Sequence, residues 1–197
     1  MNPAGDEADQ LDMGRLIQGH DAALDNLMER HSQRLFHYLL RQLPESEAED
    51  CAQETFVRIY LNRAKFRPGA KFSTWLYTIA TNLARDCQRR KTRHPEVSLD
   101  AAGDRGEDGT TLLETTADGG ATPGEALLAG ERAAQVRDAV QALPEELREA
   151  LVLYEYENLP QGEIAEILRC TPKAVETRIY RARNLLRKSL AGLMATG

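Results

Sequence analysis

The chain has 197 residues, of which 42% are hydrophobic and 28% charged, as is ordinary for a soluble globular protein. It has no run of about 18 or more apolar residues and no basic and apolar stretch at its N-terminus, so we expect neither a membrane span nor a secretion signal. Its three cysteines, Cys51, Cys87 and Cys170, lie far apart, which argues against a disulfide framework or a zinc site. We expect a cytoplasmic protein without metal or cofactor.

The net charge of −6 hides an uneven distribution of charge along the chain. Residues 1–12 hold four acids and no base, and residues 92–130 hold eight acids and two bases, so the remaining segments have 23 bases against 19 acids. Basic side chains gather in residues 85–93 and 169–188. One such run is most often a solvated helix face, but two runs, each near the end of a folded segment, favour contact with nucleic-acid phosphates.

Residues 92–130 have the composition of a linker, with seven of the fourteen glycines, two prolines and few hydrophobic residues. Such a segment cannot bury enough apolar surface to offset its chain entropy. The sequence therefore predicts a disordered tail over 1–12, a first domain over 13–91, a flexible acidic linker over 92–125 and a second domain over 126–193.

Both domains are expected to be all-α, because apolar residues recur at helical spacing and no alternating strand pattern occurs. The residue before a proline avoids the helical conformation, so Leu43-Pro44, Leu143-Pro144 and Leu159-Pro160 separate helices. The predicted helices are a short, weak one over 10–18, then 21–42, 46–62 and 73–90 in the first domain, and 126–142, 145–157, 161–168 and 172–190 in the second.

The last two predicted helices have the spacing of a helix-turn-helix, with a three-residue turn between them. Thr171 can cap the long helix and Pro172 suits its first position. The apolar residues that would anchor the long helix are Val175, Ile179, Ala182 and Leu186. Its opposite face carries polar groups able to read base edges in the major groove, namely Lys173, Glu176, Thr177, Tyr180, Arg181 and Asn184. The alternative is a plain helical hairpin with a charged surface.

Four aromatic residues, Phe66, Phe72, Trp75 and Tyr77, precede a basic stretch in the first domain. Aromatic rings stack on unpaired bases and basic side chains hold phosphates, so the segment favours single-stranded nucleic acid. The alternative is that these rings fill a small core. We expect Trp75 to be both packed and partly exposed.

Four motifs, in this order and spacing, resemble the sigma-70 class of bacterial RNA polymerase sigma factors, in the short two-domain extracytoplasmic-function (ECF) group. They are DCAQETFV at 50–57, KFSTWLYTIATN at 71–82, Leu143-Pro144 with Arg148, and EIAEIL at 163–168 followed by VETRIYRAR at 175–183. The resemblance covers about 20–91, as a region 2-like domain, and about 130–190, as a region 4-like domain.

The resemblance implies a transcription initiation factor that directs RNA polymerase core to promoters. Residues matching the segment that docks on the β′ clamp helices are Asp50, Gln53, Glu54, Phe56 and Val57. The loop Arg63–Lys71 would capture a base of the melted −10 element, and the −10 set is Arg63, Phe66, Phe72, Trp75, Tyr77, Asn82, Arg85, Asp86 and Arg89. The −35 set is Lys173, Glu176, Thr177, Arg178, Tyr180 and Arg181.

Further partners implied by the resemblance are the β flap of the polymerase and an inhibitory anti-sigma factor. The protein would be a specificity subunit rather than an enzyme, because the polymerase core does the chemistry.

Two residues depart from the family pattern. Arg169 stands in the turn where glycine is usual, and Glu176 stands at a base-facing position where a basic residue is frequent, so the −35 sequence is expected to differ from the common one.

Two other classes of protein compete with this interpretation. A conventional repressor or activator could use the same helix-turn-helix, but it would normally dimerise and would not need the aromatic segment. An enzyme is disfavoured, because the four histidines and three cysteines form no catalytic order, metal spacing or glycine phosphate loop.

Overall fold

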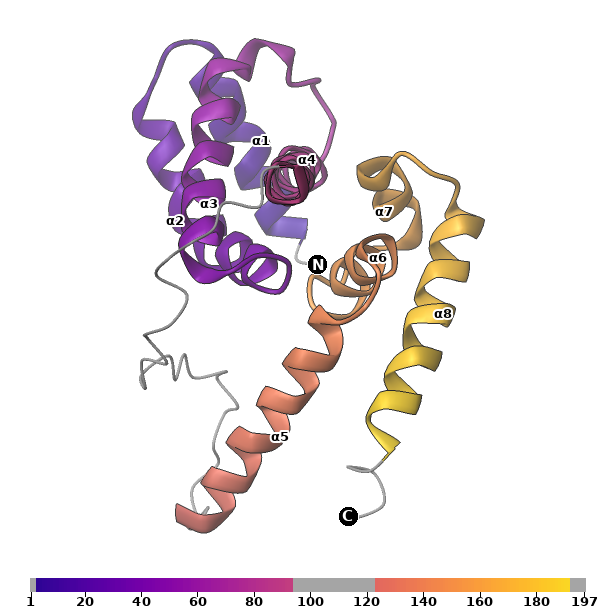
Figure 1. Ribbon diagram of the computed structural model, residues 1–197. Coiled ribbons are helices and arrows are strands. Elements are labelled where there is room, and N and C mark those ends of the chain that lie inside the picture. Colours follow the sequence, from indigo (N-terminus) through magenta and orange to yellow (C-terminus); the bar gives the residue numbers. More distant parts are fainter. Residues whose placement is uncertain (1–2, 94–122, 192–197) are drawn as a thin grey trace.

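The computed structural model describes residues 3–93 and 123–191, and every regular element within them is helical (Figure 1). This confirms the all-α expectation for these residues. The helices are α1 (Pro3–Ile17), α2 (Ala22–Leu40), α3 (Glu45–Leu61), the 3-10 turn η1 (Arg63–Lys65), α4 (Phe72–Arg93), α5 (Pro123–Gln141), α6 (Glu145–Glu155), α7 (Gln161–Leu168) and α8 (Pro172–Ser189). None of the described helices combines the length and apolar character needed to cross a bilayer.

The N-terminal domain packs α1, α2 and α3 around one side of α4. Each helix turns an apolar stripe inward, at the period of 3.6 residues that the sequence showed. Tyr38 of α2 lies fully buried at the centre, where its hydroxyl is 2.6 Å from the hydroxyl of Thr81 on α4. This internal hydrogen bond satisfies two polar groups that would otherwise be costly to bury.

The first helix corrects the sequence prediction, which gave a disordered tail over residues 1–12 and a weak helix over 10–18. In the structure α1 is continuous from Pro3, and Asp9, Asp12 and Met13 are buried against α2. The prediction failed because acids without neighbouring bases look like a solvated tail. Here their partner, Arg30, comes from the next helix, and a local pattern cannot show such a pairing.

The C-terminal domain is the expected helix-turn-helix preceded by two helices. The Thr171 hydroxyl accepts a hydrogen bond of 3.2 Å from the Ala174 amide, and Pro172 follows it in the first turn of α8, as expected. Arg169 ends α7 with φ of 53°, in the left-handed region that favours glycine. The turn therefore keeps the geometry that a glycine would adopt, even though a side chain stands there.

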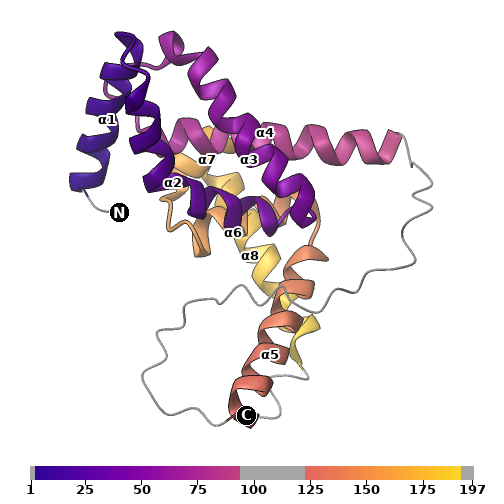
Figure 2. The ribbon, with the colours of Figure 1, turned by 90° about the vertical axis from the view of Figure 1, so that its left-hand side faces the viewer.

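The two domains lie against each other in the structure. Helix α7 packs on α4, and α6 also lies beside the N-terminal helices, whereas most of α5 extends away from them (Figures 1 and 2). The predicted linker falls largely on residues 94–122, which lie outside the described residues. A tether alone does not specify where the second domain sits, so this contact was not foreseeable from composition.

Candidate nucleic-acid interface

Helix α3 exposes one stripe of the residues expected to bind another protein. Asp50, Gln53, Glu54 and Val57 are exposed at helical spacing, and the Val57 side chain is 49% accessible. The next turn adds Leu61, a further apolar group at 69% accessibility. A stripe that ends in two exposed aliphatic side chains has the mixed character of a protein-binding surface.

Phe56 does not belong to this stripe, although the sequence placed it there. It is buried against the core of the N-terminal domain, on a face of α3 turned by about 100° from Val57. One helical residue advances by about 100°, so neighbours in sequence point in different directions. Phe56 therefore stabilises the helix that carries the stripe and does not itself face a partner.

The aromatic segment divides into buried and accessible rings. Phe66, Phe72 and Tyr77 are buried, so they cannot stack on bases in this arrangement, and for them the alternative of a small core is correct. Trp75 is partly buried against Phe66, with ring centroids 5.3 Å apart, so it is both packed and partly exposed as expected. A domain of this size needs most of its large rings to fill its core.

The polar residues expected along the −10 surface lie mainly on α4. Asn82 is partly exposed, while Asp86 and Arg89 are exposed and lie 3.7 Å apart as an ion pair one turn on. Arg63 lies on the η1 turn, where its guanidinium stacks 4.4 Å from the centroid of the Tyr60 ring. These four residues are accessible from solvent to differing degrees; the Arg85 side chain is 19% accessible and differs from them in its partner.

Arg85 points into the contact between the two domains and forms a bidentate ion pair with Glu149 of α6. Its Nε and Nη2 atoms lie 2.7 and 2.6 Å from the two carboxylate oxygens, and the Glu149 side chain has no accessible surface. Burial raises the pKa of Glu149, and the hydrogen bonds and charge of Arg85 act against that rise. The hydrogen bonds to Glu149 in turn raise the pKa of Arg85.

Two more glutamates of the C-terminal domain reach the same side of the N-terminal domain. The Tyr77 hydroxyl donates to the carboxylate of Glu157, which is also 3.3 Å from the guanidinium of Arg34. Lys71 and the Thr74 hydroxyl both bind the carboxylate of Glu163 on α7. We call Glu149, Glu157 and Glu163 with their partners the carboxylate seam. Three residues of the expected −10 set or of the loop Arg63–Lys71 are thus occupied by acidic side chains of this chain: Lys71, Tyr77 and Arg85.

Sequence reasoning missed the carboxylate seam. One signal was available for Glu149, because it lies three and four residues before Val152 and Leu153 on the apolar face of its helix. An acid on an apolar stripe is expected to have a buried basic partner. The identity of that partner, 64 residues earlier in the chain, could not be read from spacing.

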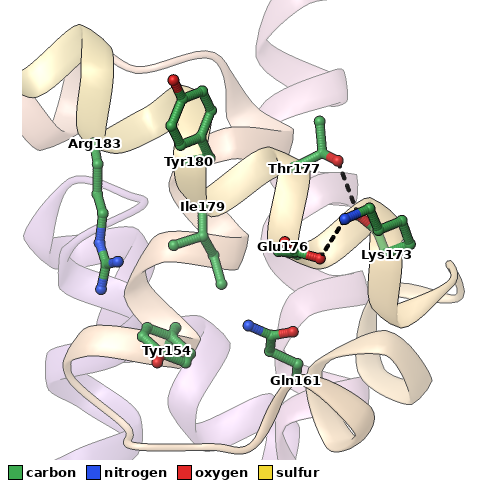
Figure 3. Close-up of a pocket in the computed structure, with 8 residues that line it drawn as sticks. All are labelled: Tyr154, Gln161, Lys173, Glu176, Thr177, Ile179, Tyr180 and Arg183. Atoms are coloured by element: carbon green, nitrogen blue, oxygen red, sulfur yellow. Dashed lines mark hydrogen bonds and ion pairs between the residues drawn. The ribbon is translucent and has the colours of Figure 1, made fainter.

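The exposed face of α8 frames a shallow pocket of about 350 Å³ (Figure 3). Six residues of α8 line it together with Tyr154 of α6 and Gln161 of α7, and the six are Lys173, Glu176, Thr177, Ile179, Tyr180 and Arg183. Tyr180 is 67% accessible, and Lys173 pairs with Glu176 at 2.8 Å. Four of the predicted −35 residues therefore share one surface.

The sequence predicted Arg178, and not Arg183, on the −35 surface, and the structure places the two the other way round. Arg178 turns toward α6, where its Nη2 atom lies 2.7 Å from Glu146, so it braces the domain instead of facing the pocket. Arg183, which was not predicted, lines the pocket with its Nε atom 2.8 Å from Glu155 and its guanidinium 5.4 Å from the Tyr154 ring. Arg181 is exposed on α8 outside the pocket lining.

The cysteines and acidic groups of the described residues form no cluster of three or more potential metal ligands. Cys87 donates to Glu47 at 3.3 Å, and burial with this hydrogen bond raises the pKa of its thiol to about 11. A thiol with such a pKa is almost fully protonated at neutral pH, which makes it a poor nucleophile.

Comparison with known families assigns both domains. The Sigma-70 region 2 family matches residues 27–94, and the Sigma-70, region 4 family matches residues 133–186. The first match covers α2 to α4, which carry the α3 stripe and the α4 surface. The second covers the C-terminal part of α5, all of α6 and α7 and most of α8, and so includes the pocket.

Several curated proteins resemble almost the whole chain. RNA polymerase sigma-H factor of Pseudomonas aeruginosa is 34% identical over 190 residues, covering 95% of this chain and 96% of that protein. ECF RNA polymerase sigma factor SigW of Bacillus subtilis is 36% identical, with 89% and 93% covered. ECF RNA polymerase sigma-E factor of Escherichia coli is 32% identical, with 90% and 92% covered.

Solved structures share the arrangement of helices. CnrH, solved in complex with the cytosolic domain of CnrY, superposes with a TM-score of 0.69 at 26% identity, covering 94% of this chain and 98% of CnrH. The sigma factor RpoE of Bartonella quintana, solved with the anti-sigma factor NepR, gives a TM-score of 0.65 at 20% identity, with 85% and 96% covered. With its two domains matched and its relatives aligned end to end, the chain belongs to the ECF group of sigma-70 factors, promoter-specific transcription initiation factors that bind RNA polymerase.

Proposed function

We propose that the protein reads promoters at two places, the −35 duplex with α8 and the melted −10 element with α4 and the loop before it. The observation that carries this proposal is the open face of α8, where Lys173, Thr177 and Tyr180 stand accessible after a helix-turn-helix turn. A helix presented in this way fits the major groove, with its side chains against base edges and phosphates. Arg181 adds a positive charge at the margin of this face.

The exposed stripe of α3 is the surface proposed for the β′ clamp helices of RNA polymerase. Val57 and Leu61 supply apolar area, and Asp50, Gln53 and Glu54 supply the polar rim, so the stripe resembles a small protein interface. The C-terminal domain would approach the β flap. The polymerase core would perform the chemistry, which makes this chain a non-catalytic specificity subunit working in the cytoplasm.

Contact with the −10 element requires the carboxylate seam to open. While Glu149 binds the Nε–Nη2 edge of Arg85, that edge cannot hold a phosphate or a base, and the C-terminal domain likewise occupies Lys71 through Glu163 and Tyr77 through Glu157. DNA phosphates offer these groups the same kind of acceptor that the glutamates offer. Separation of the domains would thus accompany promoter binding, with one set of acceptors replacing the other.

A protein partner that holds the chain inactive is part of the proposal. It is supported by the likeness to CnrH, whose solved structure contains the cytosolic domain of CnrY. Such an anti-sigma partner would act on the surfaces described above, by covering the α3 stripe or by keeping the carboxylate seam closed.

Run-off transcription with purified bacterial core polymerase tests the proposal. The template is a promoter taken from upstream of this protein's own gene, used both as a duplex and with a pre-opened −10 segment. Three variants accompany the wild-type chain: Asn82→Ala on α4, Val57→Glu on the α3 stripe and, as a control, Ser32→Ala at an exposed site of α2.

The proposal expects specific transcripts that depend on the protein and are unchanged by Ser32→Ala. Val57→Glu should weaken core binding on both templates, because it places a charge in an apolar contact. Asn82→Ala should be defective on the duplex and recover on the pre-opened template. Binding of the duplex without any binding to core polymerase would instead support the conventional helix-turn-helix regulator.

A further inference from the structure

We infer that α1 is a brace for promoter opening, and that Gln10 is the positioning residue that holds the tip of the capture loop. By capture loop we mean residues 66–71, between η1 and α4. The inference rests on the proposed function, in which this loop receives an unpaired base. Helix α1 lies before residue 27, where the match to the region 2 family begins, so the family match does not account for it.

The carboxamide of Gln10 binds two consecutive backbone groups at the tip of the capture loop. The Gly69 amide donates to Gln10 Oε1 at 3.3 Å, and Gln10 Nε2 donates to the Ala70 carbonyl oxygen. A side-chain amide has one acceptor and one donor group side by side, so it can satisfy a backbone N–H and a C=O together. An alkyl group of the same length could satisfy neither.

The tip has an unusual backbone that gains from such a clamp. Gly69 has φ of 81°, a conformation that glycine tolerates, and it follows Pro68 in an exposed turn. The other backbone hydrogen bonds that the described residues show for this segment are local ones, such as Ala70 N to Arg67 O at 3.0 Å. Gln10 therefore supplies a tie across 60 residues to the tip of a loop whose own backbone hydrogen bonds are local, in addition to the ion pair that Lys71, at the end of the loop, makes with Glu163.

Helix α1 is itself fixed firmly enough to serve as a support. Arg30 of α2 binds Asp9 at 2.9 Å and Asp12 at 2.6 Å, and both carboxylates are buried. Burial raises the pKa of Asp12, but hydrogen bonds from Arg30 and Asn26 outweigh it and hold this pKa below its usual value. The ionised carboxylate thus anchors α1 at neutral pH.

A second route connects α1 to the base of the capture loop. Asp9 also lies 2.8 Å from Nε2 of His31, and the His31 ring packs on Phe72 with centroids 5.0 Å apart. Phe72 packs in turn on Phe66, which begins the loop, at 6.5 Å between centroids. Both ends of the loop are set in the core and its tip is held by Gln10, while Arg67, Pro68 and Gly69 remain exposed to receive a ligand.

A loop ordered before it binds loses less conformational entropy on binding. If the loop captures a melted base, holding its tip lowers the free energy of the open promoter without any contact between Gln10 and DNA. Loss of Gln10 should then slow opening and leave the affinities for core polymerase and for the −35 duplex unchanged.

The test compares Gln10→Met, which keeps length and removes both hydrogen bonds, with Gln10→Glu, which keeps the acceptor and removes the donor. Glu7→Gln, at an exposed site of α1, is the matched control. Each full-length variant is assayed with core polymerase on the duplex and pre-opened templates. Hydrogen exchange across residues 66–71 and the thermal unfolding midpoint are measured on the same samples.

For Gln10→Met we expect faster exchange at the Gly69 amide, an unfolding midpoint lowered by no more than a few degrees, and initiation on the duplex lowered by about tenfold, the size expected for losing one or two hydrogen bonds. Initiation on the pre-opened template should return close to wild type. Gln10→Glu should show a defect of the same direction, and Glu7→Gln none.

Three results would overturn the inference: duplex initiation unchanged by Gln10→Met, an equal loss on both templates, or a fall in the unfolding midpoint that accounts for the loss. In each case the wild-type chain still directs specific initiation. If the wild-type chain directs no initiation with core polymerase, the proposed function itself has failed, and the two failures are therefore distinguishable.

Discussion

The surfaces of α4 and α8 are both proposed to bind promoter DNA, yet the structure leaves them in opposite states. Helix α8 turns Tyr180 and its polar neighbours to solvent beside an open pocket, whereas α4 turns the partly accessible Arg85 onto the buried carboxylate of Glu149. Lys173 and Arg183 of α8, which line the pocket, form ion pairs with the exposed acids Glu176 and Glu155. The cation of α4 pairs with a carboxylate that has no access to solvent.

Two basic residues can look equivalent in the sequence, each as a member of a basic run. The structure shows that they can nevertheless differ in how available they are to DNA. Exposed pairs contribute little and exchange partners readily, while a buried pair resists the loss of either member. We therefore expect the −35 surface to be ready for DNA in the free protein, and the −10 surface to become ready only after the carboxylate seam opens.

The largest expected effect concerns the −10 surface of α4, which the carboxylate seam closes. Arg85→Ala leaves the buried carboxylate of Glu149 without its partner, which should destabilise the closed arrangement by about 3–5 kcal/mol. The domains should then separate in the DNA-free protein. Energy transfer between dyes placed on α2 and α8, or small-angle scattering, would measure the change in distance, with circular dichroism verifying that the helices persist.

Two controls make that result specific. Arg89→Ala lies one turn further along α4, on an exposed side chain, and should leave the distance unchanged. The double variant Arg85→Met with Glu149→Leu replaces the buried ion pair by apolar groups and should restore the closed arrangement. Wild-type distances in Arg85→Ala would show that the ion pair does not hold the domains together.

A smaller effect is expected at the −35 surface of α8, which is open to solvent. Arg181→Ala should weaken binding to a −35 duplex by about tenfold and lower the salt slope of the binding constant by about 1, as expected for one lost phosphate contact. Arg178→Ala should leave the slope unchanged, because its guanidinium is bound to Glu146 on α6. Titrations at several salt concentrations would separate the two, and equal slopes for both variants would contradict this assignment.

The turn before α8 gives a prediction of similar or smaller size. Arg169 has a left-handed backbone that costs a non-glycine residue about 1–2 kcal/mol, so Arg169→Gly should raise the free energy of unfolding by roughly 1 kcal/mol. Arg169→Ala should bring no such gain. Denaturant unfolding measures both. A stabilised Arg169→Gly variant that also binds the −35 duplex less well would place the arginine on a phosphate.

The smallest expected effect concerns the rim of the carboxylate seam. Lys71 and Glu163 form a partly exposed pair, so Lys71→Met should weaken the closed arrangement by less than about 1 kcal/mol. The same dye pair should report only a small change in distance, and raising the salt concentration should reduce even that. A change as large as that of Arg85→Ala would mean that the seam depends on its rim and not on its buried pair.

The sequence by itself determined the helices from α2 onward, the helix-turn-helix with its Thr171 cap, and the membership of the sigma-70 class, because periodicity, capping and motif order are local properties. It also predicted Trp75 as a ring that is both packed and partly exposed. Tertiary structure alone decided that Phe56, Phe66, Phe72 and Tyr77 turn into the core.

Tertiary structure also decided which charged groups meet. Asp9 and Asp12 find Arg30, Arg85 finds Glu149, and Gln10 finds the tip of the capture loop, each across at least one loop of chain. The physical reason is that a charged or amide side chain takes the partner that packing brings to it. Packing joins residues that are far apart in sequence, so no local pattern along the chain specifies that partner.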